Sequence, residues 1–398
     1  MSALSPLERG LLALVALLSA LAGLANYLEW AAVPRFAIAT LALAGLAWVV
    51  SFATEQLGER FGPGVTGLMQ STLGNLPELF VVIFALQKGE LIVAQTAIVG
   101  SVFANALLVL GLVIVVGARR APDGVMRFSK RLPRDTATLL QVTAFIIVLL
   151  GLSLAAQDRA SHHVDQISII GAISLLVVYI AWVVPYVRSD TAPGSTDASS
   201  SSRGAPGATD GSGAGSGSDA APRATGARPQ AAEGRSPDED PPARAPRLSL
   251  ALTLTLLAVA GVASAFVSDW FINGLSPAIE QLGISQAFAG LVIVAIAGNA
   301  VENTAGLVLA WKGRSDLAIS VVKNSVAQIS AFLFPLLVLV SFALATTLTF
   351  ALGPVYIGAF LLTALAVWQV TGDGEAAEFE GWSLVAIYVI LAAVALYE

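Results

Sequence analysis

The chain contains no cysteine and only two histidines. The lack of cysteine excludes disulfides, thiolate metal sites and cysteine nucleophiles. The two histidines, His162 and His163, are neighbours in a polar segment, which argues against a histidine-based catalytic or zinc site inside any apolar segment. Charge is also scarce, since 12% of the 398 residues are charged against about 25% in a typical soluble domain. No basic cluster of the kind that binds nucleic acid is present, so no nucleic-acid partner is expected.

Apolar residues dominate instead. They make up 56% of the chain, and they recur in runs of about 18 or more, the length that crosses an apolar layer of about 30 Å. In hydrocarbon each run must satisfy its own backbone hydrogen bonds, so each is predicted to be a helix. We therefore predict an all-α membrane protein with about 11 transmembrane helices, of which the first is a retained span rather than a cleaved signal. The segments lie near 10–29, 33–54, 63–87, 91–117, 136–156, 165–187, 248–268, 286–310, 316–342, 346–370 and 381–397.

The distribution of lysine and arginine predicts the orientation of these spans. The loop after the fourth span is rich in basic residues and should be cytoplasmic; it holds Arg119, Arg120, Arg127, Lys130, Arg131 and Arg134. Counting spans from this loop places the N-terminus in the cytoplasm and the C-terminus outside. The high content of Ala, Gly and Leu, without a targeting signal, favours the inner membrane of a bacterium.

Two stretches of the chain resemble each other across a polar linker. Residues 189–247 are rich in Ser, Gly, Ala and Pro and are predicted to form a disordered cytoplasmic linker. On its two sides, GNLPE ending at Glu78 corresponds to GNAVE ending at Glu302, an offset of 224 residues. Lys88-Gly89 and Lys312-Gly313 share this offset, and the sequence EQLG recurs upstream at an offset of 225, at 55–58 and 280–283. We infer an internal duplication.

An odd number of crossings separates the third span from the eighth, so the two repeats must run in opposite directions. The predicted organisation is an extra N-terminal transmembrane helix (1–32), a first five-helix repeat (33–188), the linker (189–247) and a second, inverted five-helix repeat (248–398). Inverted repeats with a site at the middle of the bilayer are the plan of many secondary transporters.

The repeated motif carries an acid deep in the membrane. Glu78 and Glu302 each lie about 15 residues into a long apolar segment, near the bilayer centre. A carboxylate at that depth is costly and is usually functional, although a neutral glutamic acid that only ties helices together would also fit. Asn75 and Asn299 precede the acids by three residues and so share their helix faces.

The residues around the acids favour a hard cation. Gly74 and Gly298 allow a close approach or a local break, and Pro77 frees a backbone carbonyl one turn earlier. Calcium prefers about 6–8 oxygen ligands, and two carboxylates balance its charge. Glu78 and Glu302 are therefore the predicted calcium ligands.

The next span of each repeat offers further oxygens. Ser101 and Asn105 lie in the fourth span, and Ser325 and Gln328 lie in the ninth; each either lines the ion site or only bonds neighbouring helices. Two close carboxylates cannot both remain charged after the cation leaves, so protons should replace it. Calcium and protons would then compete for the same acids, which couples their movements.

Four segments carry a resemblance to a known family: GNLPELFVVIFALQKG, GNAVENTAGLVLAWKG, GSVFANALLVLG and NSVAQISAFLFP. They resemble the paired motifs of the calcium/proton exchangers of the cation/calcium antiporter superfamily. The resemblance implies the plan of one plus five plus five spans. It also implies that Glu78 and Glu302 exchange the cation for protons, and that the neighbouring Asn, Ser and Gln side chains line the site.

The resemblance implies calcium as a transported substrate, with protons and the lipid bilayer as the other partners and no cofactor; self-association is left open. Three positions depart from the family pattern. Asn303 stands where His is usual, Asn324 where Gly is usual, and Ala104 where Ser is usual.

Lys323 is an unusual charge, about two turns from the cytoplasmic start of the ninth span. Its long side chain could extend to the membrane interface. Alternatively, its ammonium could pair with Glu302 or Glu78 and alter the selectivity or stoichiometry of transport.

Three other functions were weighed. Exchange of calcium for sodium is the nearest, but Gln328 stands where a further acid would favour sodium, so protons are preferred. An intramembrane enzyme is not expected, because no span carries an activated Ser, a His pair or a His-Glu metal motif. A passive channel is compatible with the residue types, but inverted repeats with acids at the bilayer centre favour alternating access.

Overall fold

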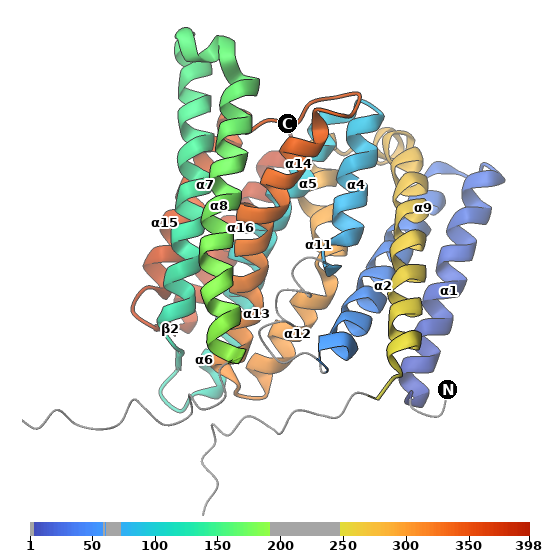
Figure 1. Ribbon diagram of the computed structural model, residues 1–398, viewed down its shortest axis with the longest axis horizontal. Coiled ribbons are helices and arrows are strands. Elements are labelled where there is room, and N and C mark those ends of the chain that lie inside the picture. The colour runs from blue at the N-terminus through green and yellow to red at the C-terminus, as the bar shows by residue number, and fades with distance from the viewer. Residues whose placement is uncertain (1–3, 59, 61–72, 192–246) are drawn as a thin grey trace, which may run out of the picture. The chain divides into compact units, whose positions relative to one another are not determined.

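The computed structural model describes residues 4–58, 60, 73–191 and 247–398 (Figure 1). The described helices belong to one compact unit. Most of the predicted linker, 192–246, and the first part of the predicted third span, 63–72, lie outside the described residues.

The described chain is almost entirely helical. Before the linker it forms α1 (Pro6–Tyr27), α2 (Ala32–Gly58), α4 (Leu76–Gln87), α5 (Leu91–Phe103), the π-helix η1 (Ala104–Val109), α6 (Leu110–Arg120), β1 (Val125–Arg127), α7 (Arg131–Ala156), the 3-10 helix η2 (Arg159–His163) and α8 (Val164–Thr191). After it follow α9 (Leu250–Leu282), α10 (Gln286–Phe288), the π-helix η3 (Ala289–Val294), α11 (Ala295–Gly298), α12 (Ala300–Trp311), α13 (Ser315–Gln328), the π-helix η4 (Ile329–Leu333), α14 (Phe334–Ser341), α15 (Pro354–Thr371), β2 (Glu375–Ala377) and α16 (Glu378–Leu396).

The helices have the length and composition of membrane spans. Among the described residues nine are long and apolar enough to cross a membrane, and ten if the bent pair formed by 286–298 and α12 counts as one span. Of the predicted third span, only the part from residue 73 onward is described, and it contains the short apolar helix α4. The membrane-spanning helical fold is thus as expected, whereas the number eleven stays a prediction.

Two predicted segments have the wrong bounds. The seventh was expected at 248–268, but α9 continues without a break to Leu282. Asp269, the first residue past the expected end, is paired with Lys88. The tenth was expected at 346–370, but α15 begins only at Pro354, a residue that favours the first turn of a helix. The apolar residues before it, such as Phe350, are buried in an irregular connection.

A short two-stranded sheet was not foreseen. β1 and β2 pair in antiparallel fashion, with Met126 opposite Ala376. These strands come from the basic loop after α6 and the acidic loop after α15, and Arg127 lies 3.6 Å from the carboxylate of Glu375. Strands of three residues are too short to show an alternation of apolar and polar residues, so the sequence predicted only loops here.

Helix boundaries before and after the linker correspond at one offset. Shifting α4 (Leu76–Gln87) by 224 residues gives α12 (Ala300–Trp311) at both ends. The same shift places η1 over η4, each a π-helical segment within a longer helix. Gly89 and Gly313, also 224 residues apart, both have positive φ, +78° and +73°. Because π-helical segments are rare, this agreement is a second and independent sign of repetition.

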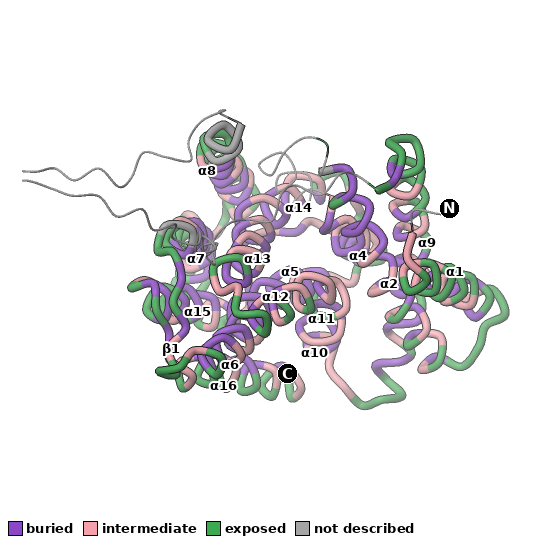
Figure 2. Tube along the Cα trace, turned by 90° about the horizontal axis from the view of Figure 1, so that it is seen from below, coloured by how far each residue is buried: buried purple, intermediate pink, exposed green. Residues whose placement is uncertain are grey.

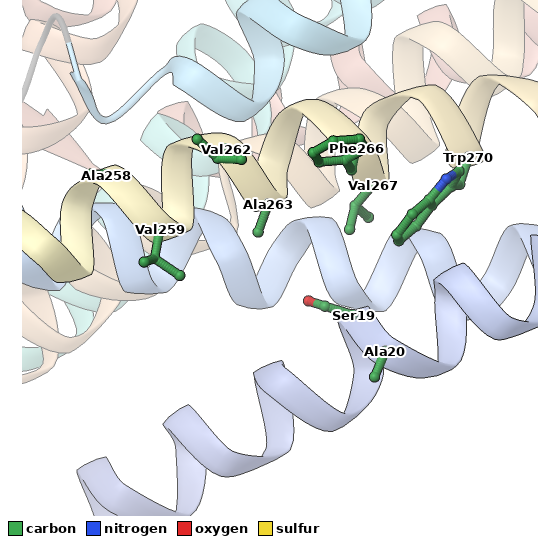
Figure 3. A pocket seen from close by; sticks show the side chains of 9 residues that line it. All are labelled: Ser19, Ala20, Ala258, Val259, Val262, Ala263, Phe266, Val267 and Trp270. Carbon is green, nitrogen blue, oxygen red and sulfur yellow. The ribbon is translucent and has the colours of Figure 1, made fainter.

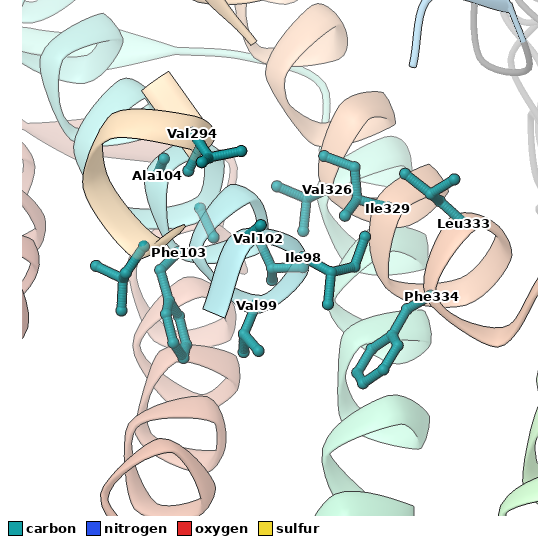
Figure 4. Packing of buried hydrophobic residues seen from close by; sticks show 14 of the residues in the cluster. Ile98, Val99, Val102, Phe103, Ala104, Val294, Val326, Ile329, Leu333 and Phe334 are labelled. Atoms are coloured by element: carbon teal, nitrogen blue, oxygen red, sulfur yellow. The ribbon is translucent and has the colours of Figure 1, made fainter. Parts of the chain in front are cut away.

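The segment from α5 to α6 is at the centre of the fold. Of its most apolar 18-residue window 89% is buried, compared with 22% for α1 and for α9, and Figure 2 shows the difference. Ile98, Val102 and Phe103 pack with residues of η3, α13, η4 and α14 (Figure 4). The fourth span therefore holds its polar side chains in a fixed apolar setting.

A glycine contact brings α5 and η3 together. A Cβ atom added at Gly100 would lie 2.5 Å from the Cα of Leu291, a backbone atom that cannot move aside. By contrast, a Cβ at Gly298 would meet the Cβ of Glu78 at 3.8 Å, an ordinary contact.

We expect Gly100→Ala to destabilise the protein by about 1–3 kcal/mol, because the two backbones must separate. Gly298→Ala is the matched control and should leave the thermal midpoint of the purified protein nearly unchanged. Equal midpoints for the two variants would show that the α5–η3 crossing tolerates a side chain.

Candidate functional site

Each motif acid follows a break in its helix. In the second half, the helical stretch ending at Gly298 and α12 are bent by 61° with respect to each other. In the first half, Gly74 and Asn75 form a turn before α4. The acids are therefore in the first turn of a short helix, and of the two possibilities left open for Gly74 and Gly298 the structure shows the local break. The positive end of a helix dipole favours a negative charge at that place.

Three polar side chains join the two halves. Asn299 donates from Nδ2 to the hydroxyl of Ser101 at 3.0 Å, and Asn105 donates from Nδ2 to Oδ1 of Asn299 at 2.9 Å. Asn299 also donates to the carbonyl of Ala295, and Asn105 to that of Ser101, so each amide is held by its own helix as well. All three side chains are fully buried. Asn299 is therefore a fixed link between α5–η1 and the helix break of the second half.

Glu78 is buried beside this link. It is 2% exposed, and neither of its carboxylate oxygens has a hydrogen-bond partner. Ser101 and the carboxylate of Glu302 both act on it electrostatically. The side chain lines a small cavity of about 10 Å³. The other lining residues are Leu43, Pro77, Val81, Phe271, Val294, Ala297 and Gly298. A buried carboxylate without a donor is costly unless a proton or a cation binds it.

The remaining candidate residues differ from Glu78 in burial and in hydrogen bonding. Asn75 is buried and has an interaction partner, and Ser325 is 4% exposed with an unpaired hydroxyl. Glu302 and Gln328 are only partly buried. Within the described part of the chain, no hydrogen bond links Ser325 or Gln328 to the cluster of Ser101, Asn105 and Asn299. The acid of the first half is thus closed off more completely than the acid of the second half.

Two further buried oxygens lie in the motif regions. The Oδ1 atoms of Asn303 and Asn324 are buried without a partner, as are Oδ1 of Asn105 and the Ser325 hydroxyl. Asn303 and Asn324 are two of the three positions where this chain departs from the family pattern, so that departure was the available signal. Unpaired oxygens in both motif regions are therefore candidate neutral ligands in addition to the two acids.

Lys323 does not face the acids. Its side chain is fully buried, and its ammonium donates to the hydroxyl of Thr371 on α15 at 3.0 Å. Thr136 of α7 donates to the backbone carbonyl of Lys323. The described residues contain no ion pair between Lys323 and Glu78 or Glu302, and the side chain does not extend to an exposed surface. Neither of the two sequence-based interpretations therefore describes its position here.

We expect Lys323→Met to fold and to keep its transport activity and pH dependence, because replacing a buried charge by an apolar side chain is often neutral or stabilising. Thr371→Val should instead lower the free energy of unfolding by about 1–3 kcal/mol, since it leaves the ammonium without its acceptor. Thermal midpoints of both purified variants test this. A larger loss for Lys323→Met than for Thr371→Val would contradict it.

One wide apolar pocket is too poor in polar groups to be an ion site. It has a volume of about 560 Å³ and lies between α1 and α9 (Figure 3). Its lining is apolar apart from Ser19 and includes Val259, Phe266 and Trp270. Such a surface offers almost no ligands for a cation, whereas the small cavity beside Glu78 has one of the two motif acids in its wall. No group of three His, Cys, Asp or Glu residues gathers in the described ranges, so a metal ion would depend on two acids and neutral oxygens.

Comparison with known proteins gives agreement over nearly the whole chain. A Ca(2+)/H(+) antiporter of Aphanothece halophytica is 27% identical over 372 residues, covering 92% of this chain and 91% of that protein. The solved structure of native YfkE has a TM-score of 0.72 at 24% identity and covers 98% of this chain and all of its own. The H+/Ca2+ exchanger CAX has a TM-score of 0.68 at 13% identity, covering 98% and 92%. These structural likenesses establish the fold.

The sequence resemblance noted above is confirmed by these matches and by a family model. The model described as sodium/calcium exchanger protein matches residues 31–186 and 252–397, which is more than half of the chain and includes both motifs. The chain therefore belongs to the sodium/calcium exchanger protein family.

Proposed function

We propose that this protein is a secondary transporter that exchanges calcium for protons by alternating access, with Glu78 and Glu302 as the shared site. The observation that carries the proposal is the environment of Glu78. Its carboxylate is buried, makes no hydrogen bond of ordinary geometry, has among the described residues only the Ser101 hydroxyl nearby as a donor and lies within electrostatic reach of Glu302. Such an arrangement is unfavourable as two bare charges and favourable with either a divalent cation or protons bound.

The side chains around the acids have distinct parts in this proposal. Glu78 and Glu302 neutralise the cation, one from each half of the chain. Unpaired oxygens of Asn105, Asn303, Asn324 and Ser325 are available as neutral ligands, and Ca²⁺ needs about 6–8 oxygens at about 2.3–2.6 Å. Asn299 holds the two halves in register through Ser101 and Asn105. When the cation leaves, protons take its place on the carboxylates, so the two movements are coupled.

Alternating access is supported by the repeated architecture. The matching helix boundaries, π-helical segments and positive-φ glycines at one offset fit a duplicated unit. With eleven crossings the two units would be inverted, and inverted repeats around broken helices are a common basis of alternating access. In Figure 1 the start of α1 and the end of α16 lie at opposite ends of the helices, which agrees with an odd number of crossings. We place the N-terminus in the cytoplasm of a bacterium, on the basis of the basic loops.

Uptake into vesicles tests the exchange reaction. Purified protein is reconstituted into vesicles without sodium, and calcium uptake is followed with and without an imposed pH gradient. We expect uptake only when the vesicle interior is more acidic, because outward proton movement then drives calcium inward. Equal uptake with and without the pH gradient would refute coupling to protons. If the pH gradient could not drive calcium uptake against a calcium gradient, the protein would be a channel.

Sodium/calcium exchange is the second candidate function. The description of the matching family favours it, while the relative named as a Ca(2+)/H(+) antiporter favours protons. The neutral Gln328 near the second motif also favours protons, since a further acid there would help to hold sodium. A sodium gradient at constant pH separates the two: uptake driven by sodium alone would replace the proposal. A third candidate, altered selectivity caused by Lys323, loses its support because the ammonium contacts Thr371.

A further inference from the structure

A polar network joins the turn between α4 and α5 to helix α9. Lys88 ends α4, Gly89 turns the chain with a positive φ, and Glu90 begins α5. Lys88 Nζ lies 2.6 Å from Oδ1 of Asp269 and donates to Oδ1 of Asn273 at 2.5 Å. Glu90 accepts from the hydroxyl of Ser276 at 2.7 Å. The three partners are at positions i, i+4 and i+7, so they form one stripe along α9.

This network connects both site helices to one partner. α4 carries Glu78 and ends at this turn, and α5 begins there and carries Ser101. α9 packs along α2 and α4, and it contributes Phe271 to the small cavity beside Glu78. Glu90 also accepts from Gln286 at 3.1 Å, which joins the start of the second broken helix to the same turn. The network therefore closes the site helices against α9 at one end of the molecule.

On α2, the helix that corresponds to α9, the acceptors for the lysine are not repeated. The corresponding turn of the second half, Lys312-Gly313-Arg314, keeps the lysine and the positive-φ glycine. At the repeat offset of 225, however, Asp269 and Asn273 of α9 correspond to Ala44 and Trp48 of α2. Neither can accept a hydrogen bond from an ammonium through a carboxylate or amide oxygen. The pair of acceptors for Lys88 is thus specific to α9, and the internal repeat does not explain it.

The strength of the network suits a contact that opens and closes. The side chains of Lys88 and Asp269 are 31% and 36% exposed, and an exposed ion pair shifts an equilibrium by about fivefold or less. We propose that Lys88 and Glu90, with the stripe Asp269, Asn273 and Ser276, form a polar latch that holds the non-cytoplasmic end of the ion pathway closed. The latch rests on the proposed exchange function, in which that end must open once in each cycle.

Cross-linking tests whether the latch must open. The chain has no cysteine, so the double variant Lys88→Cys, Asp269→Cys can be joined by a short bifunctional thiol reagent without side reactions. We expect cross-linking to reduce proton-driven calcium uptake to the level of empty vesicles, and cleavage of the linker by reductant to restore it. Full uptake by the cross-linked protein would overturn the latch.

A matched control is the pair Arg119 and Glu378, an exposed ion pair at 2.7 Å that joins α6 to α16. Cross-linking Arg119→Cys, Glu378→Cys should leave uptake unchanged. Inhibition in both double variants would mean that any tether stops the protein, and the latch would be withdrawn.

A labelling experiment keeps the latch separate from the exchange function. Ala297 lines the cavity beside Glu78, so a single cysteine at Ala297→Cys reports access to the site. Adding Asp269→Asn should speed its labelling by a membrane-impermeant maleimide from the side of the Lys88 turn by up to about fivefold, whereas adding Arg119→Gln should not. If Asp269→Asn leaves the labelling rate unchanged, the latch is overturned whatever the calcium assay shows. If Asp269→Asn speeds labelling but the wild type takes up no calcium, only the proposed function is overturned.

Discussion

Glu78→Gln is expected to abolish calcium uptake. Glutamine keeps the size and an oxygen of the side chain but removes the charge that balances the cation and the site that takes up the proton. The interaction of one charge with another at about 4 Å in a partly screened site is about 4 kcal/mol, or about a thousandfold in affinity. Uptake should fall to the level of empty vesicles, and equilibrium calcium binding to the purified variant should weaken by at least that order.

Glu302→Gln should have the same effect, because the two acids share the ion. A suitable control is Glu280→Gln, which removes a charge from the exposed side of α9 and should transport normally. Comparable uptake by Glu78→Gln and the wild type would exclude Glu78 from the site. The same result for Glu302→Gln alone would mean that the ion depends on the first half only.

Asn299→Ala should produce the second largest loss. Asn299 is the donor to Ser101 and the acceptor from Asn105. Its removal leaves one buried hydroxyl and one buried amide group without a partner across the interface. Each unsatisfied group costs about 1–3 kcal/mol, so calcium affinity should fall by about ten- to a hundredfold if the cluster holds the site in shape. Calcium binding and thermal midpoints of the same preparation separate loss of affinity from loss of folding.

The control for Asn299→Ala is Thr304→Ala on the same helix. Thr304 is exposed and its hydroxyl donates only to the carbonyl of Ala300, one turn earlier. It should bind calcium as the wild type does. Equal affinities for the two variants would show that the Asn299 link has no influence on the ion site.

The sequence identified the two candidate acids because its signals were local. The motif repeated at an offset of 224 gave both acids, and Gly298 next to Asn299 indicated a possible break that the structure contains. Apolar length gave the helical membrane fold. These features depend on residue type and spacing, which the sequence alone contains.

Other features depended on contacts that spacing does not encode. The position of Glu78 at the start of a short helix follows from the turn at Gly74 and Asn75, whereas the apolar run suggested a continuous span. Lys323 gains its partner from Thr371, which is 48 residues away. Asp269, inside α9, gains its partner from Lys88, which is 181 residues away. The π-helical segments have no composition that distinguishes them from the α-helices around them.

Proton release on calcium binding tests the central claim most directly. Purified protein in weakly buffered detergent solution is titrated with calcium while a pH indicator reports protons set free. We predict that the wild type releases protons, that the number falls as the solution becomes more alkaline and the acids are already ionised, and that Glu78→Gln releases fewer. Calcium binding to the wild type with no proton release at any pH would contradict a site shared by calcium and protons.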